Sequence, residues 1–160
     1  MKPPDRPTNV SMGELGVIIE AGSLRTLLGS CLGVALFDRR CKVAGLAHIV
    51  LPDSGGRTET LGKYANTAIP ELIRKMSVLA KVGNLKLTAK LAGGANMFGN
   101  ADATSTVGSQ NLAAVERILE ELGIPVTGRH CGGDQGRRMT LESATGTVTI
   151  EVVGASSIII

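Results

Sequence analysis

Two apolar segments separated by a short polar one place the strongest limit on the fold. Residues 32–37 and 43–51 are rich in Val, Leu, Ile and Ala, whereas residues 38–42 read Asp-Arg-Arg-Cys-Lys. Short apolar runs joined by a few polar residues are typical of an antiparallel β-hairpin. The hairpin would bring its two open ends together, and those ends carry Cys31 and His48. We therefore expect this thiol and this imidazole to lie within hydrogen-bond reach of each other.

Cys31 stands in a turn of small residues. Gly29, Ser30 and Gly33 surround it, so little side-chain bulk is available to bury the thiol. Only a thiolate is a good nucleophile, and a thiol near backbone N–H groups ionises more readily than a free one. With His48 as the base, these features indicate a catalytic cysteine. The competing interpretation is an inert core cysteine beside a core histidine, which is the commoner role of either residue type alone.

Two segments have the spacing of amphipathic helices. Apolar residues recur every three or four positions over residues 67–81, where Thr67 is the expected N-terminal cap. The same spacing over residues 112–122 predicts a second helix. Gln110 and Asn111 precede this pattern, so we expect them to cap the start of the second helix.

The remaining apolar segments are expected to form strands. They cover residues 16–20, 85–91, 126–131, 139–141 and 147–153. Strands that are grouped, rather than alternating one for one with helices, predict an α+β fold in layers with mostly antiparallel sheets. Residues 1–10 contain three prolines and no periodicity. We therefore expect a flexible N-terminal arm over residues 1–10, followed by a single domain over residues 11–160.

Composition argues against several classes of function. Aromatic residues make up 2% of the chain, and the 17 basic and 14 acidic residues are dispersed, which disfavours nucleic-acid binding. Three cysteines and no apolar leader segment suggest a reducing cytoplasm rather than a secreted disulfide-bonded protein. The cysteine spacing fits no zinc site, and no apolar run is long enough to cross a bilayer. The expected protein is cytoplasmic and has no metal or other cofactor.

Several short motifs follow one another in a fixed order along the chain. They are Leu-Leu-Gly-Ser-Cys at 27–31, Ala-His-Ile-Val-Leu-Pro-Asp-Ser-Gly-Gly at 47–56, Gly-Lys-Tyr-Ala-Asn-Thr-Ala at 62–68, Leu-Ala-Gly-Gly-Ala-Asn-Met-Phe at 91–98, Val-Gly-Ser-Gln-Asn at 107–111 and Cys-Gly-Gly-Asp-Gln-Gly-Arg at 131–137. Together they resemble the motifs of the CheD family of chemotaxis deamidases. The resemblance covers residues 12–153. It implies a layered α/β/β sandwich and a protein-glutamine glutaminase that converts chemoreceptor glutamines to glutamate with release of ammonia.

The resemblance also implies roles for individual residues. Cys31 would be the nucleophile and His48 the base. The third catalytic residue of the family is a threonine a few positions before the cysteine, which implies Thr26, with Arg25 beside it. The resemblance also favours contact of Pro52, Asp53 and Ser54 with the substrate. Backbone N–H groups give four further candidates for contact with the reacting amide, at Gly29, Ser30, Gly93 and Gly94. Close packing of the backbone against another strand explains the last two glycines equally well.

Two other functions fit parts of the sequence. Residues 29–33, Gly-Ser-Cys-Leu-Gly, formally match a nucleophile elbow, but that motif requires a helix directly after the nucleophile, whereas residues 32–37 are β-like. A non-catalytic chemotaxis module would instead use the cleft at Cys31 to bind a receptor or a CheC-type phosphatase. The family resemblance implies such a phosphatase as a possible partner of the deamidase as well.

Overall fold

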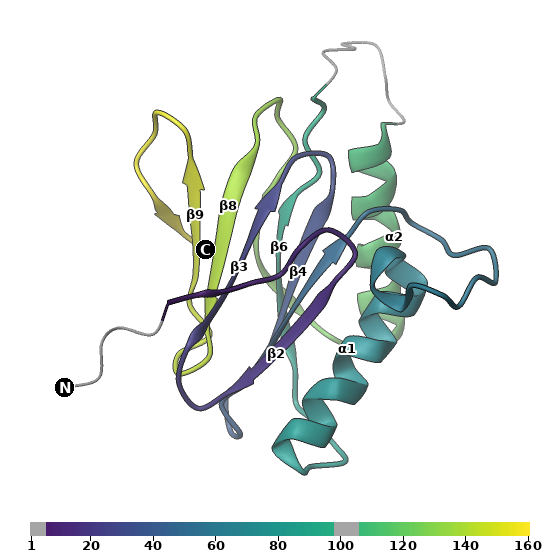
Figure 1. Ribbon diagram of the computed structural model, residues 1–160, viewed down its shortest axis with the longest axis vertical. Helices are drawn as coiled ribbons and strands as arrows, with labels where there is room; N and C mark the ends of the chain where they lie inside the picture. Colours follow the sequence, from purple (N-terminus) through teal and green to yellow (C-terminus); the bar gives the residue numbers. More distant parts are fainter. Residues whose placement is uncertain (1–5, 98–105) are drawn as a thin grey trace.

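The computed structural model describes residues 6–97 and 106–160, which form three layers. In Figure 1 the two α-helices cover one face of a central sheet, and a second, outer sheet covers the other face. The central sheet has the strand order β2-β5-β4-β6-β7, and the outer sheet has the order β1-β3-β8-β9-β10. The predicted α+β class and the layered α/β/β sandwich implied by the motifs are both confirmed.

Element boundaries are as follows. The strands are β1 (Thr8–Asn9), β2 (Leu15–Ile19), β3 (Ser23–Leu28), β4 (Leu32–Asp38), β5 (Val43–Ile49), β6 (Thr88–Gly93), β7 (Val126–Cys131), β8 (Arg137–Glu142), β9 (Val148–Val152) and β10 (Ile158–Ile159). The helices are the short 3-10 turn η1 (Leu61–Lys63) and the α-helices α1 (Ala65–Ala80) and α2 (Val107–Glu121). Neither α-helix of the described segments has the length and hydropathy needed to cross a membrane.

The predicted hairpin forms the centre of the molecule. Strands β4 and β5 pair antiparallel in the expected register, with Leu32 opposite Ile49 and Gly33 opposite His48. Asp38 ends β4 at the closed end of the hairpin, where its carboxylate accepts hydrogen bonds from the backbone N–H groups of Arg40 (2.8 Å) and Lys86 (2.7 Å). The loop and the neighbouring segment are therefore held by one buried side chain.

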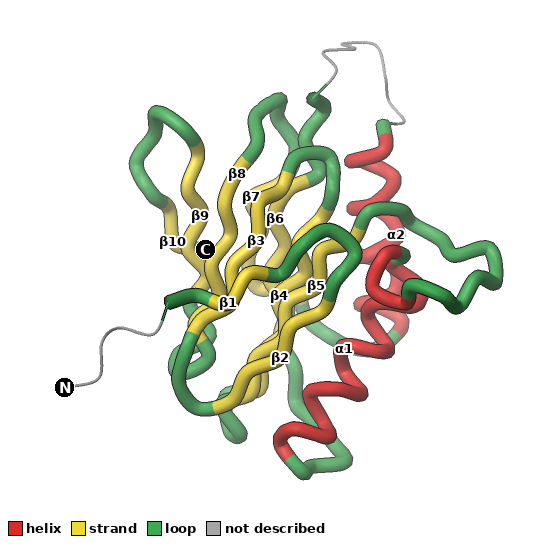
Figure 2. Tube along the Cα trace, in the orientation of Figure 1, coloured by secondary structure: helices red, strands yellow, loops and turns green. Residues whose placement is uncertain are grey.

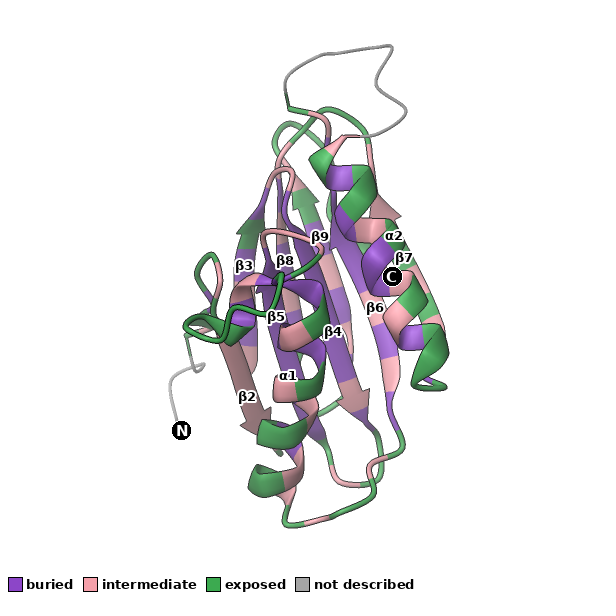
Figure 3. Ribbon diagram, turned by 90° about the vertical axis from the view of Figure 1, so that its right-hand side faces the viewer, coloured by how far each residue is buried: buried purple, intermediate pink, exposed green. Residues whose placement is uncertain are grey.

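Two hydrophobic cores lie on the two faces of the central sheet. The larger core lies between this sheet and the helices, and it includes Leu32, Leu72 and Val115. The smaller core lies between the two sheets, and it includes Leu28, Cys31 and Met139. Figure 3 shows the buried strands of the central sheet behind the two helices. With both faces covered, the middle strands read as continuous apolar runs.

Both helices begin earlier than the apolar pattern predicts. Helix α1 starts at Ala65, so Thr67 lies inside it, and the hydroxyl of Thr67 donates to the carbonyl of Leu61 instead of capping the helix. Helix α2 starts at Val107 and is capped by Thr106. The expectation that Gln110 and Asn111 cap α2 is therefore wrong. Thr106 and Ser109 form a reciprocal capping box, which a search for apolar periodicity does not detect.

The last residues of the expected N-terminal arm are docked on the outer sheet. Thr8 and Asn9 form β1 and pair in parallel with β3, an arrangement visible in Figure 2. Val10 follows and is buried, with its N–H donating to the carbonyl of Arg25. Residues 1–5 of the expected arm lie outside the described residues. The docked segment brings the carbonyl of Val10 to the site described next.

Candidate active site

Cys31 and His48 both lie at the open end of the hairpin, on the side that faces the outer sheet. No hydrogen bond joins the two side chains among the described residues, so their expected hydrogen-bond reach stays a prediction. Cys31 directly precedes β4, and His48 lies on β5 opposite Gly33, two residues beyond Cys31. A side chain added at Gly33 would meet Met139 of the outer sheet, so this face of the hairpin points toward that sheet. Cys31 and His48 are 7% and 4% exposed. The expected pairing of their strands at one end is thus present.

Thr26 completes this group from the opposite sheet. It lies on β3, and its Oγ1 is 2.6 Å from His48 Nδ1 and 2.6 Å from the carbonyl oxygen of Val10. A carbonyl can only accept, so the single proton of the Thr26 hydroxyl goes to Val10. The hydroxyl oxygen then accepts from His48, whose proton must be on Nδ1. The structure thus brings Thr26, rather than Arg25, to the histidine.

The other nitrogen of His48 is left as an acceptor. Nε2 is buried and has no hydrogen-bond partner among the described residues. With the proton on Nδ1, Nε2 carries the lone pair. An orienting partner on one nitrogen and a free lone pair on the other is the arrangement that a general base requires.

Burial favours the neutral form of both Cys31 and His48. Desolvation raises the pKa of the Cys31 thiol and lowers the pKa of His48, while the carbonyl of Val10 acts in the opposite direction on the histidine. The sequence led us to expect a thiol that ionises more readily than usual. The small residues of the turn do not expose Cys31, because the outer sheet and its Met139 cover it. Proton transfer is therefore expected during the reaction, not before it.

The turn that carries Cys31 rests on the glycine segment after β6. Ala95 N–H donates to the carbonyl of Gly29 (3.0 Å), and Gly94 N–H donates to the carbonyl of Cys31 (2.9 Å). A Cβ added at Gly93 would lie 2.3 Å from the Cys31 carbonyl oxygen, and the φ of Gly93 is +103°. These contacts support the close-packing role of the glycines. The Gly94 N–H already has an acceptor, which leaves a role in substrate binding as a prediction for both glycines.

One polar residue at the site was expected from the sequence to cap a helix, with contact to substrate only a hint from the family motif. Asn111 on α2 is fully buried, and its side-chain amide Nδ2 donates to the carbonyls of Val50 (3.0 Å) and Ser30 (3.5 Å). Its Oδ1 is buried without a hydrogen-bond partner among the described residues, which costs about 1–3 kcal/mol. Its place at the end of the 107–111 motif was the only signal, because the apolar pattern begins one residue later.

Comparison with known proteins identifies the family. A family model described as CheD chemotactic sensory transduction matches residues 50–152. The chain belongs to the CheD family. A protein of Methanococcus maripaludis named probable chemoreceptor glutamine deamidase CheD is 44% identical over 142 residues, covering 88% of this chain and 92% of the relative. Relatives with the same name from Clostridium botulinum (strain Alaska E43) and Clostridium acetobutylicum are 43% and 38% identical, each covering 91% of this chain and 92% and 90% of their own.

The CheD motif that follows His48 forms a loop closed by its own hydrogen bonds. The carboxylate of Asp53 accepts from Gly55 N–H (2.9 Å), and the side chain of Asn66, on α1, accepts from Ser54 N–H (2.8 Å) and donates to Ser54 Oγ (3.1 Å). Ser54 is buried, whereas Pro52 is half-buried and Asp53 is exposed. These bonds account for the residue types, so contact of this loop with substrate stays a prediction.

The last CheD motif surrounds a buried arginine. The guanidinium of Arg137 donates to the carbonyls of His130, Gly132 and Gln135 and contacts His130 Nδ1 at 2.9 Å. Burial lowers the pKa of Arg137, and nearby Cys131 acts in the opposite direction. This cation therefore shapes the glycine-rich loop of residues 132–136.

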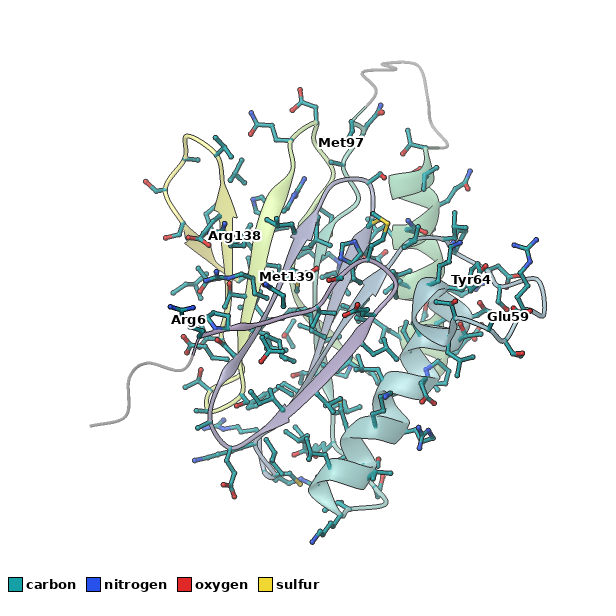
Figure 4. All side chains as sticks on the ribbon, in the orientation of Figure 1. Arg6, Glu59, Tyr64, Met97, Arg138 and Met139 are labelled. Carbon is teal, nitrogen blue, oxygen red and sulfur yellow. The ribbon has the colours of Figure 1, made fainter. Side chains whose placement is uncertain are left out.

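A groove opens beside the turn that carries Cys31. It has a volume of about 790 Å³ and is lined by residues 27–29, 135–138 and 151–153 together with Met97. Leu27, Met97 and Val153 are 66%, 48% and 95% exposed, so apolar surface is available there. Figure 4 shows Arg138 on β8 and Met97 near the upper end of the sheets. Gly29 thus links this groove to Cys31, two residues further along the chain.

Proposed function

We propose that this protein is a cytoplasmic protein-glutamine glutaminase that converts selected glutamines in the cytoplasmic domains of chemoreceptors to glutamate and ammonia. The observation that carries this proposal is the hydrogen bonding of His48, whose Nδ1 contacts Thr26 while its Nε2 has no partner among the described residues. The relatives in the CheD family, named probable chemoreceptor glutamine deamidases, support the substrate class.

The first half of the reaction forms a thioester. His48 Nε2 takes the proton of Cys31 as the sulfur attacks the side-chain carbonyl carbon of glutamine. The carbonyl oxygen becomes an oxyanion, which the backbone N–H groups of Ser30 and Cys31 stabilise. His48 then returns the proton to the amide nitrogen as the carbon–nitrogen bond breaks, and ammonia leaves.

The second half of the reaction releases glutamate. His48 Nε2 takes a proton from water, the water oxygen attacks the thioester carbon, and the proton passes to the departing sulfur of Cys31. His48 is cationic in both halves of the cycle. Thr26 accepts from the Nδ1–H and orients it, and the carbonyl of Val10 in turn accepts from the Thr26 hydroxyl, so both dipoles stabilise this cation. No cofactor is needed for these steps.

The groove beside Gly29 is the proposed approach for the receptor. Its exposed apolar residues suit an amphipathic helix, and its position next to the nucleophile turn would place a glutamine of that helix at Cys31. A CheC-type phosphatase that binds the same groove would compete with the receptor. Competition between the two would distinguish a shared groove from independent sites.

The test is mass spectrometry of a chemoreceptor cytoplasmic fragment incubated with the protein. The wild type is expected to convert glutamine to glutamate at defined positions, and Cys31→Ser is expected to abolish this conversion. Cys41→Ser is the matched control, because Cys41 is also a free thiol but lies at the closed end of the hairpin. Conversion that survives in Cys31→Ser would refute the mechanism. Absence of conversion by the wild type would instead favour the non-catalytic binding module.

A further inference from the structure

One face of α2 packs directly on the turn that carries the nucleophile. Gly108 and Asn111 are three residues apart and therefore share this face. A Cβ added at Gly108 would lie 2.4 Å from the carbonyl oxygen of Gly94, so helix and glycine segment meet backbone to backbone. Gly94 in turn donates to the carbonyl of Cys31. This close approach is what allows the short side chain of Asn111 to reach the turn.

The hydrogen bond from Asn111 to Ser30 sets the orientation of one peptide group. The described residues contain no cis peptide bond, and in a trans peptide the C=O and the N–H point in opposite directions. The carbonyl of Ser30 points to Asn111, so the N–H of Cys31, in the same peptide plane, points away from α2. The hydrogen bond from Ala95 N–H to the carbonyl of Gly29 likewise directs the N–H of Ser30, in the same peptide, away from Ala95.

These two N–H groups are available to a ligand. Within residues 6–97 and 106–160, neither the N–H of Ser30 nor that of Cys31 donates to a protein acceptor. Buried or half-buried N–H groups are normally paired, and two unpaired ones next to a nucleophile form a site for an anionic oxygen. The carbonyl groups of the same two peptides, those of Gly29 and Ser30, each accept a hydrogen bond. These bonds oppose rotation of either peptide plane.

The side chain of Asn111 also contacts the residue that follows β5, the strand that carries His48. Asn111 Nδ2 donates to the carbonyl of Val50, two residues after His48. One side chain therefore joins the turn before Cys31 to the end of β5. An apolar residue would fill this buried position without leaving an unpaired oxygen, so the two donated hydrogen bonds are the reason for an amide here.

We infer that Asn111 is a positioning residue that holds the Ser30–Cys31 peptide with its N–H directed at the oxyanion. This inference rests on the proposed deamidase function and deepens it, because it names how the oxyanion donors are kept in place. Asn111 acts through the Cys31 backbone and does not touch the substrate. Its removal should therefore affect amide hydrolysis without impairing the thiol itself.

The test compares Asn111→Ala with Val115→Ala in two reactions. Both variants truncate one fully buried side chain of α2, but Val115 packs in the helix-facing core. The first reaction is deamidation of a receptor fragment, measured as kcat and KM. The second is alkylation of Cys31 by iodoacetamide, followed by peptide mapping across a pH range. Alkylation displaces iodide at a saturated carbon and develops no oxyanion, so it reports only on the thiol and its base.

Loss of an oxyanion donor typically lowers kcat by about 100-fold or more, and Asn111→Ala is expected to approach this loss with little change in KM or in the pH profile of alkylation. Val115→Ala should retain kcat. Parallel loss of deamidation and alkylation would show a merely structural role and overturn the inference, as would an unchanged kcat. If the alanine variant does not fold, Asn111→Leu takes its place in both reactions, because leucine fills the space without donating a hydrogen bond. A wild type that is alkylated at Cys31 but does not deamidate would refute the proposed function, and the inference with it.

Discussion

At the scale of single residues, the site depends on hydrogen bonds that determine where protons lie. Thr26 is neutral, yet its contacts with Val10 and His48 select one tautomer of the histidine. An aspartate in this position would add a buried charge beside His48, at a considerable desolvation cost. A hydroxyl orients the base without that charge. Its effect should therefore be visible in turnover rather than in substrate binding.

Thr26→Val is predicted to lower kcat for receptor deamidation by about 10- to 100-fold, because valine has the shape of threonine but cannot accept the Nδ1–H of His48. KM should change little. The measurement is steady-state deamidation followed by mass spectrometry. Thr26→Ser supplies the control, since it retains the hydroxyl and should recover most of the activity. Equal activity of Thr26→Val and wild type would show that Thr26 only fills space.

At the scale of secondary-structure elements, the β4–β5 hairpin is held at its closed end by Asp38. Its side chain is 0% exposed and accepts from the backbone N–H groups of Arg40, Cys41 and Lys86. Burial alone would raise the pKa of Asp38, but these hydrogen bonds lower it on balance. A lowered pKa means that the carboxylate stabilises the fold above the ordinary pKa of 3.8, and that this contribution is lost as the pH falls through the lowered value.

Asp38→Ala is predicted to reduce the free energy of unfolding by about 2–4 kcal/mol at neutral pH, because three backbone N–H groups lose their acceptor. Urea denaturation at neutral and acidic pH measures this. The difference from wild type should shrink as the pH falls and the wild-type carboxylate becomes protonated. Asp53→Ala is the matched control, because Asp53 is exposed and accepts only from Gly55. A difference independent of pH would contradict the assigned role of the charge.

Strands and helices could be predicted from the sequence where the pattern of their own residues determines the local structure. The hairpin follows from two apolar runs and a polar turn, and the helices follow from their apolar spacing. The start of α2 was missed because the residues from Val107 to Asn111 show no apolar periodicity and are set by the Thr106 capping box. The Thr26–His48 bond lay beyond prediction from spacing, since it depends on which strands of the two sheets stack. Only the family motifs pointed to Thr26.

At the scale of the whole molecule, the three layers place the helices and the groove beside Gly29 on different sides of the central sheet. The helices cover the face of the central sheet that is remote from the outer sheet, as Figure 3 shows. The groove is lined instead by residues of the outer sheet, from the ends of β3, β8 and β9. A receptor bound in the groove, as proposed, would approach the Cys31 turn from the side of the outer sheet.

Leu27→Glu is predicted to raise KM for a receptor fragment about 10-fold or more, because a charge would replace apolar contact in the groove. Alkylation of Cys31 by iodoacetamide should remain at the wild-type rate, since the small reagent does not need the groove. Val78→Glu is the control: Val78 is equally exposed, at 66%, but lies on α1. If both variants behaved alike toward the receptor, the groove would not be its approach.

The hydrogen bond between Thr26 and His48 joins the outer sheet to the central sheet. His48 lies on β5 of the central sheet and Cys31 directly precedes β4 of the same sheet, whereas Thr26 lies on β3 of the outer sheet. A newly synthesised chain that had formed only the central sheet would carry the reactive pair without its orienting partner. If these residues act as proposed, deamidation should therefore require both sheets to be packed together, and a partly folded chain should not yet modify receptors.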